Sequence, residues 1–236
     1  VFAQVLKRAI PKQPILDIDE NSDSTLFAGI DGKGIWELNK AGNRVLTVHK
    51  ESADDQNSLP GNGVYDIYCE RGKCIWVVTI SCGVSFFDVG SPVVTQIMHH
   101  PNDDNSLVNN DVNNILEDSE GKIWFATNNG ISIWNPETGK WKTLFNDKTK
   151  QAQVFLVLCE DSNGKIWAGS YSSGVYVLDS NGNELAHYAH GEKGSPSVSN
   201  FIFDIFKDSQ HDLWIGGVNG EFVFFKTREQ SFRTYT

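Results

Sequence analysis

The chain has 236 residues, of which 39% are hydrophobic and 21% charged, a composition typical of a folded protein with one or two domains. Acidic residues outnumber basic ones by 30 to 20, and the net charge of −10 disfavours binding to nucleic acid or to an anionic membrane. The apolar runs are too short to span a bilayer. We therefore expect a soluble segment that contacts neither nucleic acid nor membrane, and it stays open whether it is excised from a longer chain.

Residues 1–13 precede the repeated pattern that governs the rest of the chain. Their apolar start, Val1-Phe2-Ala3-Gln4-Val5-Leu6, predicts an arm or the outer strand of a preceding structural unit. The alternative is that Val1-Phe2-Ala3-Gln4 is the tail of a secretion signal.

Five similar segments, each centred on an aromatic anchor, recur along residues 14–236. The anchors are spaced by 49, 48, 43 and 47 residues, and a glycine follows each of them six or seven positions later. The five anchors are Phe27, Trp76, Trp124, Trp167 and Trp214. The regular spacing predicts five copies of one structural unit, with the anchor rings buried between neighbouring copies.

Each copy reads as four short strands. A β-rich run such as 112–116 ends in an acidic turn, the anchor segment follows, and the glycine introduces a third strand. A further turn leads to a fourth strand, as in residues 140–145, and residues 230–235 supply this strand in the last copy. This pattern predicts an all-β fold, a β-propeller built of five four-stranded antiparallel blades, as a fragment of a larger propeller region. The repeats cover about residues 14–49, 64–98, 112–146, 153–188 and 201–236.

The repeats resemble those of the two-component regulator propeller family, whose consensus is roughly N-S-L followed by V-x-x-I-x-x-D-x-x-G-x-I-W-x-G-T-x-x-G-I. The third copy fits best and departs only at Ala126, where the family usually has glycine. The first copy has Phe27 in place of the tryptophan, and the fifth has Gly217 in place of the threonine. The third copy matches at Asn105-Ser106-Leu107, Val112, Ile115, Asp118, Gly121, Ile123-Trp124, Thr127 and Gly130-Ile131.

This resemblance implies a function as the sensor region of a hybrid two-component system of the Bacteroidetes type. Such a region lies in the periplasm or outside the cell, responds to an oligosaccharide and regulates a histidine kinase across the inner membrane, where the parent protein is anchored. The partners that the resemblance implies are an oligosaccharide, the missing blades and the downstream signalling domains of the same polypeptide. A homodimer stays open.

Long polar loops and the turns after the anchor strands are predicted to lie on one face, because strand direction alternates within a blade. Loops on a rigid scaffold commonly carry binding sites, and Asn, Asp, Ser and Tyr suit the hydroxyls and flat faces of a sugar. The same residue types are standard loop formers, so both interpretations stay open. The candidate ligand-binding residues are Asp31, Lys33, Asn128, Asn129, Tyr171 and Asn219.

No catalytic or cofactor motif was found, so we expect no cofactor and no enzyme activity from this chain. The recurring Asp118, Asp161 and Asp208 are interpreted as turn residues, because a catalytic pair should break the symmetry of the repeat. His99, His100, His187 and His190 lack a third ligand nearby, so no metal site is expected. Cys69 and Cys74 either bridge across a hairpin or stay free. A secreted propeller-type glycoside hydrolase or lyase is the alternative function.

Overall fold

The structure, a computed structural model, is described for residues 12–22, 25–55, 57–70, 74–88, 93–149, 152–191, 195–196, 199–218 and 222–235. It divides into two compact units, and each unit is described by itself. The first comprises Val1–His99 and Asn110–Val112, and the second comprises His100–Asn109 and Asn113–Thr236. Residues 1–11, most of the expected N-terminal arm, lie outside the described residues.

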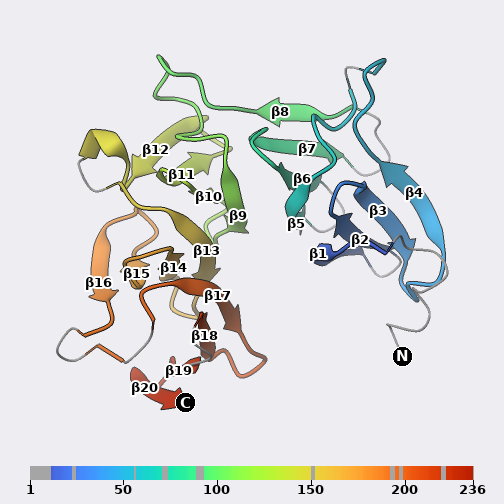
Figure 1. The fold of residues 1–236 in the computed structure, drawn as a ribbon. Coiled ribbons are helices and arrows are strands. Elements are labelled where there is room, and N and C mark those ends of the chain that lie inside the picture. Colours follow the sequence, from blue (N-terminus) through green and yellow to red (C-terminus); the bar gives the residue numbers. More distant parts are fainter. Residues whose placement is uncertain are drawn as a thin grey trace. The chain divides into compact units, whose positions relative to one another are not determined.

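The first unit contains two four-stranded antiparallel sheets whose strands follow chain order (Figure 1). The first sheet consists of β1 (Ile15–Ser22), β2 (Thr25–Ile30), β3 (Gly34–Asn39) and β4 (Val45–His49). The second sheet consists of β5 (Val64–Glu70), β6 (Cys74–Thr79), β7 (Val84–Asp88) and β8 (Thr95–Ile97). Its second strand, β6, is buried along its whole length.

The second unit contains three sheets of the same kind. The third sheet consists of β9 (Val112–Glu117), β10 (Ile123–Thr127), β11 (Gly130–Asn135) and β12 (Lys140–Leu144). The fourth consists of β13 (Phe155–Glu160), β14 (Ile166–Ser170), β15 (Val175–Leu178) and β16 (Glu184–Tyr188). The fifth consists of β17 (Ile202–Lys207), β18 (Leu213–Gly217), β19 (Phe222–Lys226) and β20 (Ser231–Tyr235). The described part of the chain has a single helical turn, η2 (Asp147–Thr149), and no helix there could cross a membrane.

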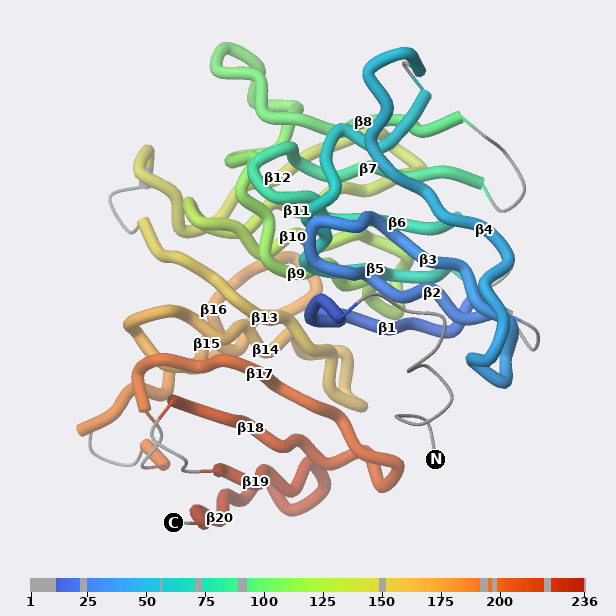
Figure 2. Tube along the Cα trace, turned by 45° about the vertical axis from the view of Figure 1, so that its right-hand side comes forward, coloured from blue at the N-terminus to red at the C-terminus, as the bar shows by residue number. Residues whose placement is uncertain are grey.

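The expected all-β architecture of five four-stranded antiparallel blades is confirmed. Within the first unit β1 packs against β5, and within the second β13 packs against β17. Figure 2 shows the chain running back and forth through each sheet in turn. The pairing of first and second strands has a register shift at the same place in four sheets, between Ile15 and Asp17 and at the equivalent residues 64/66, 155/157 and 202/204. The register shift at equivalent residues shows that these four sheets share the same local backbone geometry as well as the same strand order.

The acidic turns have the structural role expected of them. The Asp118 carboxylate accepts hydrogen bonds from the backbone N–H groups of Glu120 and Lys122 and, through Oδ2, from the indole Nε1 of Trp124 at 2.7 Å. Asp161 and Asp208 bind their own turns and the indoles of Trp167 and Trp214 in the same way. The spacing of Asp and Trp in the repeat follows from this bond, which fixes the anchor ring to the turn.

In the first four sheets, close packing of the backbone requires the glycine at the start of the third strand. Gly130 has φ of 97°, and a Cβ there would collide with the carbonyl oxygen of Leu144. Gly34, Gly83 and Gly174 also have positive φ, and a Cβ on each would collide with the carbonyl oxygen of the last residue of the fourth strand. Only glycine combines this backbone conformation with so near a neighbour.

Four of the five anchor rings are buried as expected, with exposed fractions of 1% for Phe27, 4% for Trp76, 0% for Trp124 and 2% for Trp167. The prediction was wrong for Trp214, which is 38% exposed. Trp167 packs on Phe225 and Phe232 of the following sheet. Trp214 contacts rings of its own sheet, because the described residues include no further sheet to cover it.

Candidate functional site

Asn128 and Asn129, two of the predicted ligand-binding residues, form the turn between β10 and β11. Asn128 Oδ1 accepts a hydrogen bond from Asn113 Nδ2 at 3.0 Å. Asn129 exchanges hydrogen bonds with Asp147 and so holds η2 against the turn. Both amides therefore stabilise the rim of the third sheet, whatever else they contact.

Tyr171 lies after β14 and is more than half exposed, with its ring edge-on to Phe201. The Asn113 amide that binds Asn128 also donates to the carbonyl oxygen of Phe155, whose neighbour Val154 accepts the N–H of Tyr171. Asn128 and Tyr171 thus lie on the same edge of two neighbouring sheets in the second unit.

Asp31 and Lys33 form the exposed turn between β2 and β3 in the first unit. The Asp31 N–H donates to the carbonyl oxygen of Pro14, so the turn is tied to the start of β1. Asn219 lies outside the described residues.

The histidines singled out from the sequence have structural contacts. His187 stacks on Tyr176 at 4.1 Å, and one of its ring nitrogens lies 2.6 Å from the carbonyl oxygen of Ser173. The His190 N–H donates to Asn200. Among the described residues, no three His, Cys, Asp or Glu side chains lie close enough to share a metal ion.

Cys69 and Cys74 are free and buried in the second sheet. Burial, reinforced by Asp19, raises the pKa of the Cys69 thiol far above its usual range, and burial together with Asp88 and Glu70 raises that of Cys74 to about 12. Of the two alternatives left by the sequence, the structure has the free thiols.

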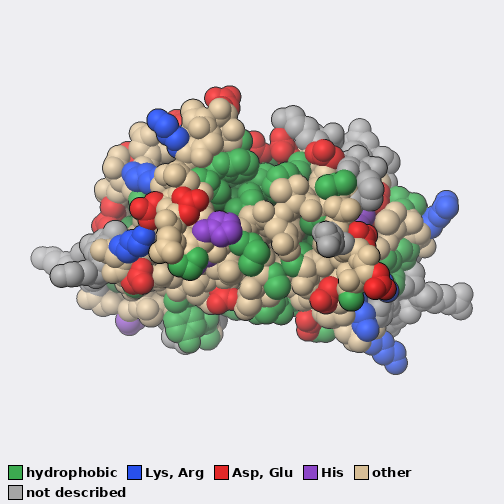
Figure 3. Space-filling model, turned by 90° about the horizontal axis from the view of Figure 1, so that it is seen from above, with side chains coloured by type: hydrophobic (Ala, Val, Ile, Leu, Met, Phe, Trp, Pro, Cys, Tyr) green, Lys and Arg blue, Asp and Glu red, His purple; other side chains and the backbone are tan. Residues whose placement is uncertain are grey.

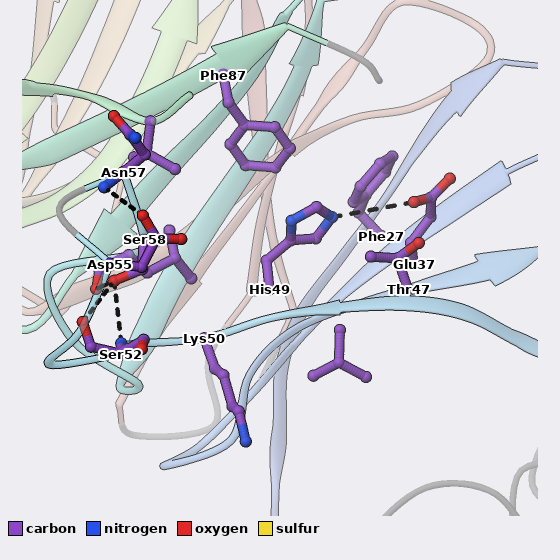
Figure 4. Close-up of a pocket in the computed structure, with 13 residues that line it drawn as sticks. Phe27, Glu37, Thr47, His49, Lys50, Ser52, Asp55, Asn57, Ser58 and Phe87 are labelled. Carbon is purple, nitrogen blue, oxygen red and sulfur yellow. Dashed lines mark hydrogen bonds and ion pairs between the residues drawn. The ribbon is translucent and has the colours of Figure 1, made fainter. Parts of the chain in front are cut away.

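A cavity of about 420 Å³ lies between the first and second sheets, within the first unit. Its apolar wall is made by Phe27 on β2, Phe87 on β7 and Leu59, and its polar wall by Glu37 on β3 and His49 at the end of β4 (Figure 4). The loop after β4 closes one side. The cavity opens to solvent along β4, because the lining residues Thr47, Val48 and Lys50 are exposed.

His49 and Glu37 face each other across the polar wall. His49 Nε2 lies 3.9 Å from Glu37 Oε2, is buried, and has no hydrogen-bond partner among the described residues. The imidazole stacks at a tilt on Phe87, with ring centroids 4.7 Å apart. Burial lowers the pKa of His49, with Glu37 opposing the shift, so the imidazole is uncharged at neutral pH.

The loop beside the cavity is built by the N-S-L motif. Asn57 N–H donates to Asp55 Oδ1, Ser58 Oγ accepts from Ser52 N–H, and Leu59 is buried. The second copy of the motif repeats these bonds at Asp103, Asn105, Ser106 and Leu107. The loop is thus a stable wall of the cavity.

The cavity exists because three residues of the first sheet depart from the repeat. Strand pairing places Phe27, Glu37 and His49 where the third sheet has Trp124, Ile133 and Leu144. The fourth sheet has Trp167, Val177 and Tyr188 at these positions. In the second unit these residues fill the space between sheets with apolar side chains.

Sequence reasoning noted the change to Phe27 but missed Glu37 and His49. The signal was available, since aligning the third and fourth strands of the copies puts a carboxylate and an imidazole at positions that are apolar in the third and fourth copies. The candidate residues chosen from the sequence came from turns, whereas this polar pair comes from within strands.

Charge argues against an anionic ligand over much of the surface. Acidic side chains lie at many points of the face drawn in Figure 3. A second hollow, in the second unit, is lined by Lys122, Lys140 and Lys142. The ammonium of Lys122 is bound by Glu120 and the carbonyl oxygen of Ser180, and that of Lys142 by the carbonyl oxygen of Asn181, so these cations hold two sheets together.

Comparison with known proteins identifies the repeats. The sequence model of the family described as two component regulator propeller matches residues 106–129, 150–172 and 196–219. A protein named Histidine kinase P4, from Formosa agariphila, is 24% identical over 182 residues, which are 74% of this chain and 13% of that protein.

Two solved structures share the fold. The extracellular domain of the hybrid two component system BT3049 from B. thetaiotaomicron superposes with a TM-score of 0.76 at 23% identity, over 95% of this chain and 30% of that one. Virginiamycin B lyase from Staphylococcus aureus superposes with a TM-score of 0.67 at 15% identity, over 96% of this chain and 71% of that one. The chain thus spans less than a third of the BT3049 domain and about an eighth of the curated relative. The chain therefore has the β-propeller fold, and three of its five repeats match the model of the two component regulator propeller family.

Proposed function

We propose that the chain is part of an extracytoplasmic sensor propeller of a hybrid two-component signalling protein, which responds to an oligosaccharide and regulates a histidine kinase. The observation that carries the proposal is the match of its repeats to the two component regulator propeller family. The fold shared with the extracellular domain of BT3049 supports a place in the periplasm or outside the cell, with the parent protein anchored in the inner membrane.

The role that we propose is binding, without catalysis. Asp118 and Asp161 each use one carboxylate oxygen for the turn and the other for an indole, and both residues are buried. A carboxylate occupied in this way is a poor general acid or base, since it cannot approach a substrate. The likeness to the virginiamycin lyase is one of fold.

Ligand contacts are proposed at the turns that follow the second strands, at Asp31 and Lys33 in the first unit and at Asn128, Asn129 and Tyr171 in the second, and Asn219 stays a candidate from the sequence. The exposed Tyr171 ring, on the same edge of neighbouring sheets as the Asn128 turn, supports this proposal in the second unit. Aromatic rings and amides are side-chain groups suited to binding a sugar.

Further blades of the same polypeptide are proposed to cover the open face of the fifth sheet. Gly29 and Gly169 leave room for Val64 and Ile202 on the first strand of the next sheet, at 2.8 and 2.7 Å from a Cβ built on each glycine. Gly216 occupies the same position on β18, but a Cβ there would meet nothing closer than 3.7 Å. The fifth sheet thus keeps the slot for a strand that the described residues do not supply.

Asp204, a hydrogen-bond acceptor on β17, also supports the docking of a further blade on the fifth sheet. Asp17 accepts the backbone N–H of Ile67 in the next sheet at 2.8 Å, and Asn114 accepts that of Leu158 at 2.8 Å. Asp204 occupies the equivalent position on β17, where it is exposed beside Phe203 and Phe206, which are 71% and 61% exposed. The partner that fits is the first strand of another blade, with a β-branched residue opposite Gly216.

The substitution Gly216→Val tests whether a further blade packs on the fifth sheet. We expect little change in the unfolding free energy of the 236-residue chain and a large loss in the full-length parent protein. Gly169→Val, the matched control, should destabilise both. An equal, small effect of Gly216→Val in both proteins would contradict the docking of a further blade. If the 236-residue chain associates with increasing concentration and Gly216→Val abolishes this association, the open face of the fifth sheet binds a second copy of the chain.

The sensor function is tested with the full-length parent protein in lipid nanodiscs. Autophosphorylation is measured with and without oligosaccharides from digested polysaccharides. A digest that changes the rate supports the proposal, and the ligand is then purified by following this activity. A parent protein without a kinase domain, or a kinase that no digest affects, would overturn it.

A further inference from the structure

We propose that the cavity between the first and second sheets binds one ring of a neutral sugar, with its hydroxyls on Glu37 and His49 and its C–H face on Val48 and Val94. The inference rests on the proposed sensor function and adds a site within the first unit that is built from strand residues, whereas the residues chosen from the sequence lie in turns. The proposed site exists because the first sheet has Glu37 and His49 at positions where the third and fourth sheets have apolar contacts.

The polar wall can bind a hydroxyl group from both sides. Nε2 of the uncharged His49 has no partner among the described residues, and Glu37 lies 3.9 Å away. A hydroxyl can accept a hydrogen bond from the imidazole N–H and donate one to the carboxylate at the same time, because it carries one donor and two acceptor sites. Burying these groups without such a partner is costly, so a ligand that supplies one is favoured.

The opposite wall suits an apolar face. Val48 is exposed and Val94 half-buried where they line the cavity, and the buried rings of Phe27 and Phe87, with centroids 6.5 Å apart, complete the apolar lining. A volume of about 420 Å³ lies in the range of small-ligand sites. A sugar ring presents C–H groups on one side and hydroxyls around its edge, which matches the two walls.

Other ligand classes fit less well. A phosphate, sulfate or uronate would meet the carboxylates of Glu37 and Asp55, while the Lys50 side chain runs away from the His49–Glu37 pair in Figure 4. A metal ion would need a third ligand that the described residues do not provide. A wholly apolar ligand would leave the polar pair unsatisfied. The charge and shape therefore select a neutral, hydroxylated ring.

The test uses the 236-residue chain with the methyl glycosides of glucose, galactose, mannose and xylose as probes and glucuronate as an anionic comparison. Binding is followed by NMR through the imidazole resonances of His49. We expect at least one neutral glycoside to shift these resonances with millimolar affinity and glucuronate to bind at least tenfold more weakly.

Two variants assign the site. Glu37→Ile with His49→Leu installs the residues of the third sheet and should abolish binding, as followed by saturation-transfer NMR of the glycoside. Glu37→Gln, which keeps the shape, should weaken binding about tenfold. Glu184→Gln, at an exposed position on β16 of the second unit, is the matched control and should leave this binding unchanged. No shift at His49 with any neutral glycoside, or binding that survives Glu37→Ile with His49→Leu, would overturn the inference.

The proposed function is judged separately, from the kinase response of the full-length protein. If the full-length Glu37→Ile, His49→Leu variant responds to oligosaccharide like the unsubstituted protein, the sensor function stands and the cavity is not its site. If no digest affects the kinase while glycosides still bind at His49, the cavity stands as a sugar site and the sensor function falls.

Discussion

The contact between the first and second sheets differs from the contact between the third and fourth, although both are made by the same repeat. In the second, Trp124, Ile133 and Leu144 pack on Phe155 and Tyr176 as one continuous apolar core. In the first, a phenylalanine and a polar pair leave a cavity. A repeat tolerates such a change at one contact because each blade packs only on its neighbours, so the other contacts keep their apolar cores.

The strongest challenge to this comparison is to move the polar pair into the packed contact. Ile133→Glu with Leu144→His should cost about 3–5 kcal/mol, since Ile133 belongs to the apolar core between the third and fourth sheets and Leu144 packs against it. Unfolding in urea, followed by tryptophan fluorescence, measures the loss. If the double variant does not fold, Leu144→His alone should show a smaller loss in the same direction. A loss below 1 kcal/mol would mean that the two contacts are equally open.

The bond between turn and anchor offers a second comparison, because the first sheet has Phe27 and so lacks it. Asp118→Ala should cost about 1.5–3 kcal/mol, since it removes an ionised acceptor from two backbone N–H groups and the Trp124 indole. Trp124→Phe, which imitates the first sheet, should lose less because the turn keeps its own bonds. Equal losses for the two variants would show that the indole bond accounts for the whole effect.

The fold was predictable from the sequence because the repeat encodes it through local chemistry. Asp118 accepts hydrogen bonds from its own turn, and Gly130 lies too close to the backbone of Leu144 for any residue with a Cβ. The alternation of apolar residues determines which face of each strand is buried. The exposure of Trp214 was not predictable, because burial depends on whether a neighbouring sheet follows. The His49–Glu37 pair was missed since its two members are distant in sequence and meet only through the pairing of β3 with β4.

Filling the cavity should stabilise the protein. Glu37→Ile with His49→Leu is expected to raise the unfolding free energy by about 1–2 kcal/mol, because it replaces two poorly satisfied polar groups by buried apolar ones. The urea midpoint measures the change, and Glu37→Gln serves as a control that leaves the volume unchanged. A loss of stability would indicate that Glu37 and His49 are already well satisfied in the free protein, and the two contacts would then be equivalent in energy.

The smallest effect concerns the pH dependence of stability. The pKa of His49 is lowered by burial, so the unfolded chain takes up a proton at this residue at higher pH than the folded one. The contribution of His49 to stability is therefore complete above the ordinary histidine pKa of 6.5 and is lost as the pH falls through the lowered pKa of the folded state. The charged groups that line the cavity around His49 are Glu37 on β3 and Lys50 and Asp55 in the loop after β4, and Phe87 on β7 is uncharged.

The substitution Glu37→Gln should lower the pKa of His49 further, since the carboxylate is the group that favours the imidazolium. NMR titration of the His49 ring gives both pKa values, and the stability of a His49→Leu variant should lack this part of the pH dependence. A pKa of His49 above 6.5 would mean that the ion pair with Glu37 outweighs burial, and the polar wall would then be closed by its own salt bridge at neutral pH.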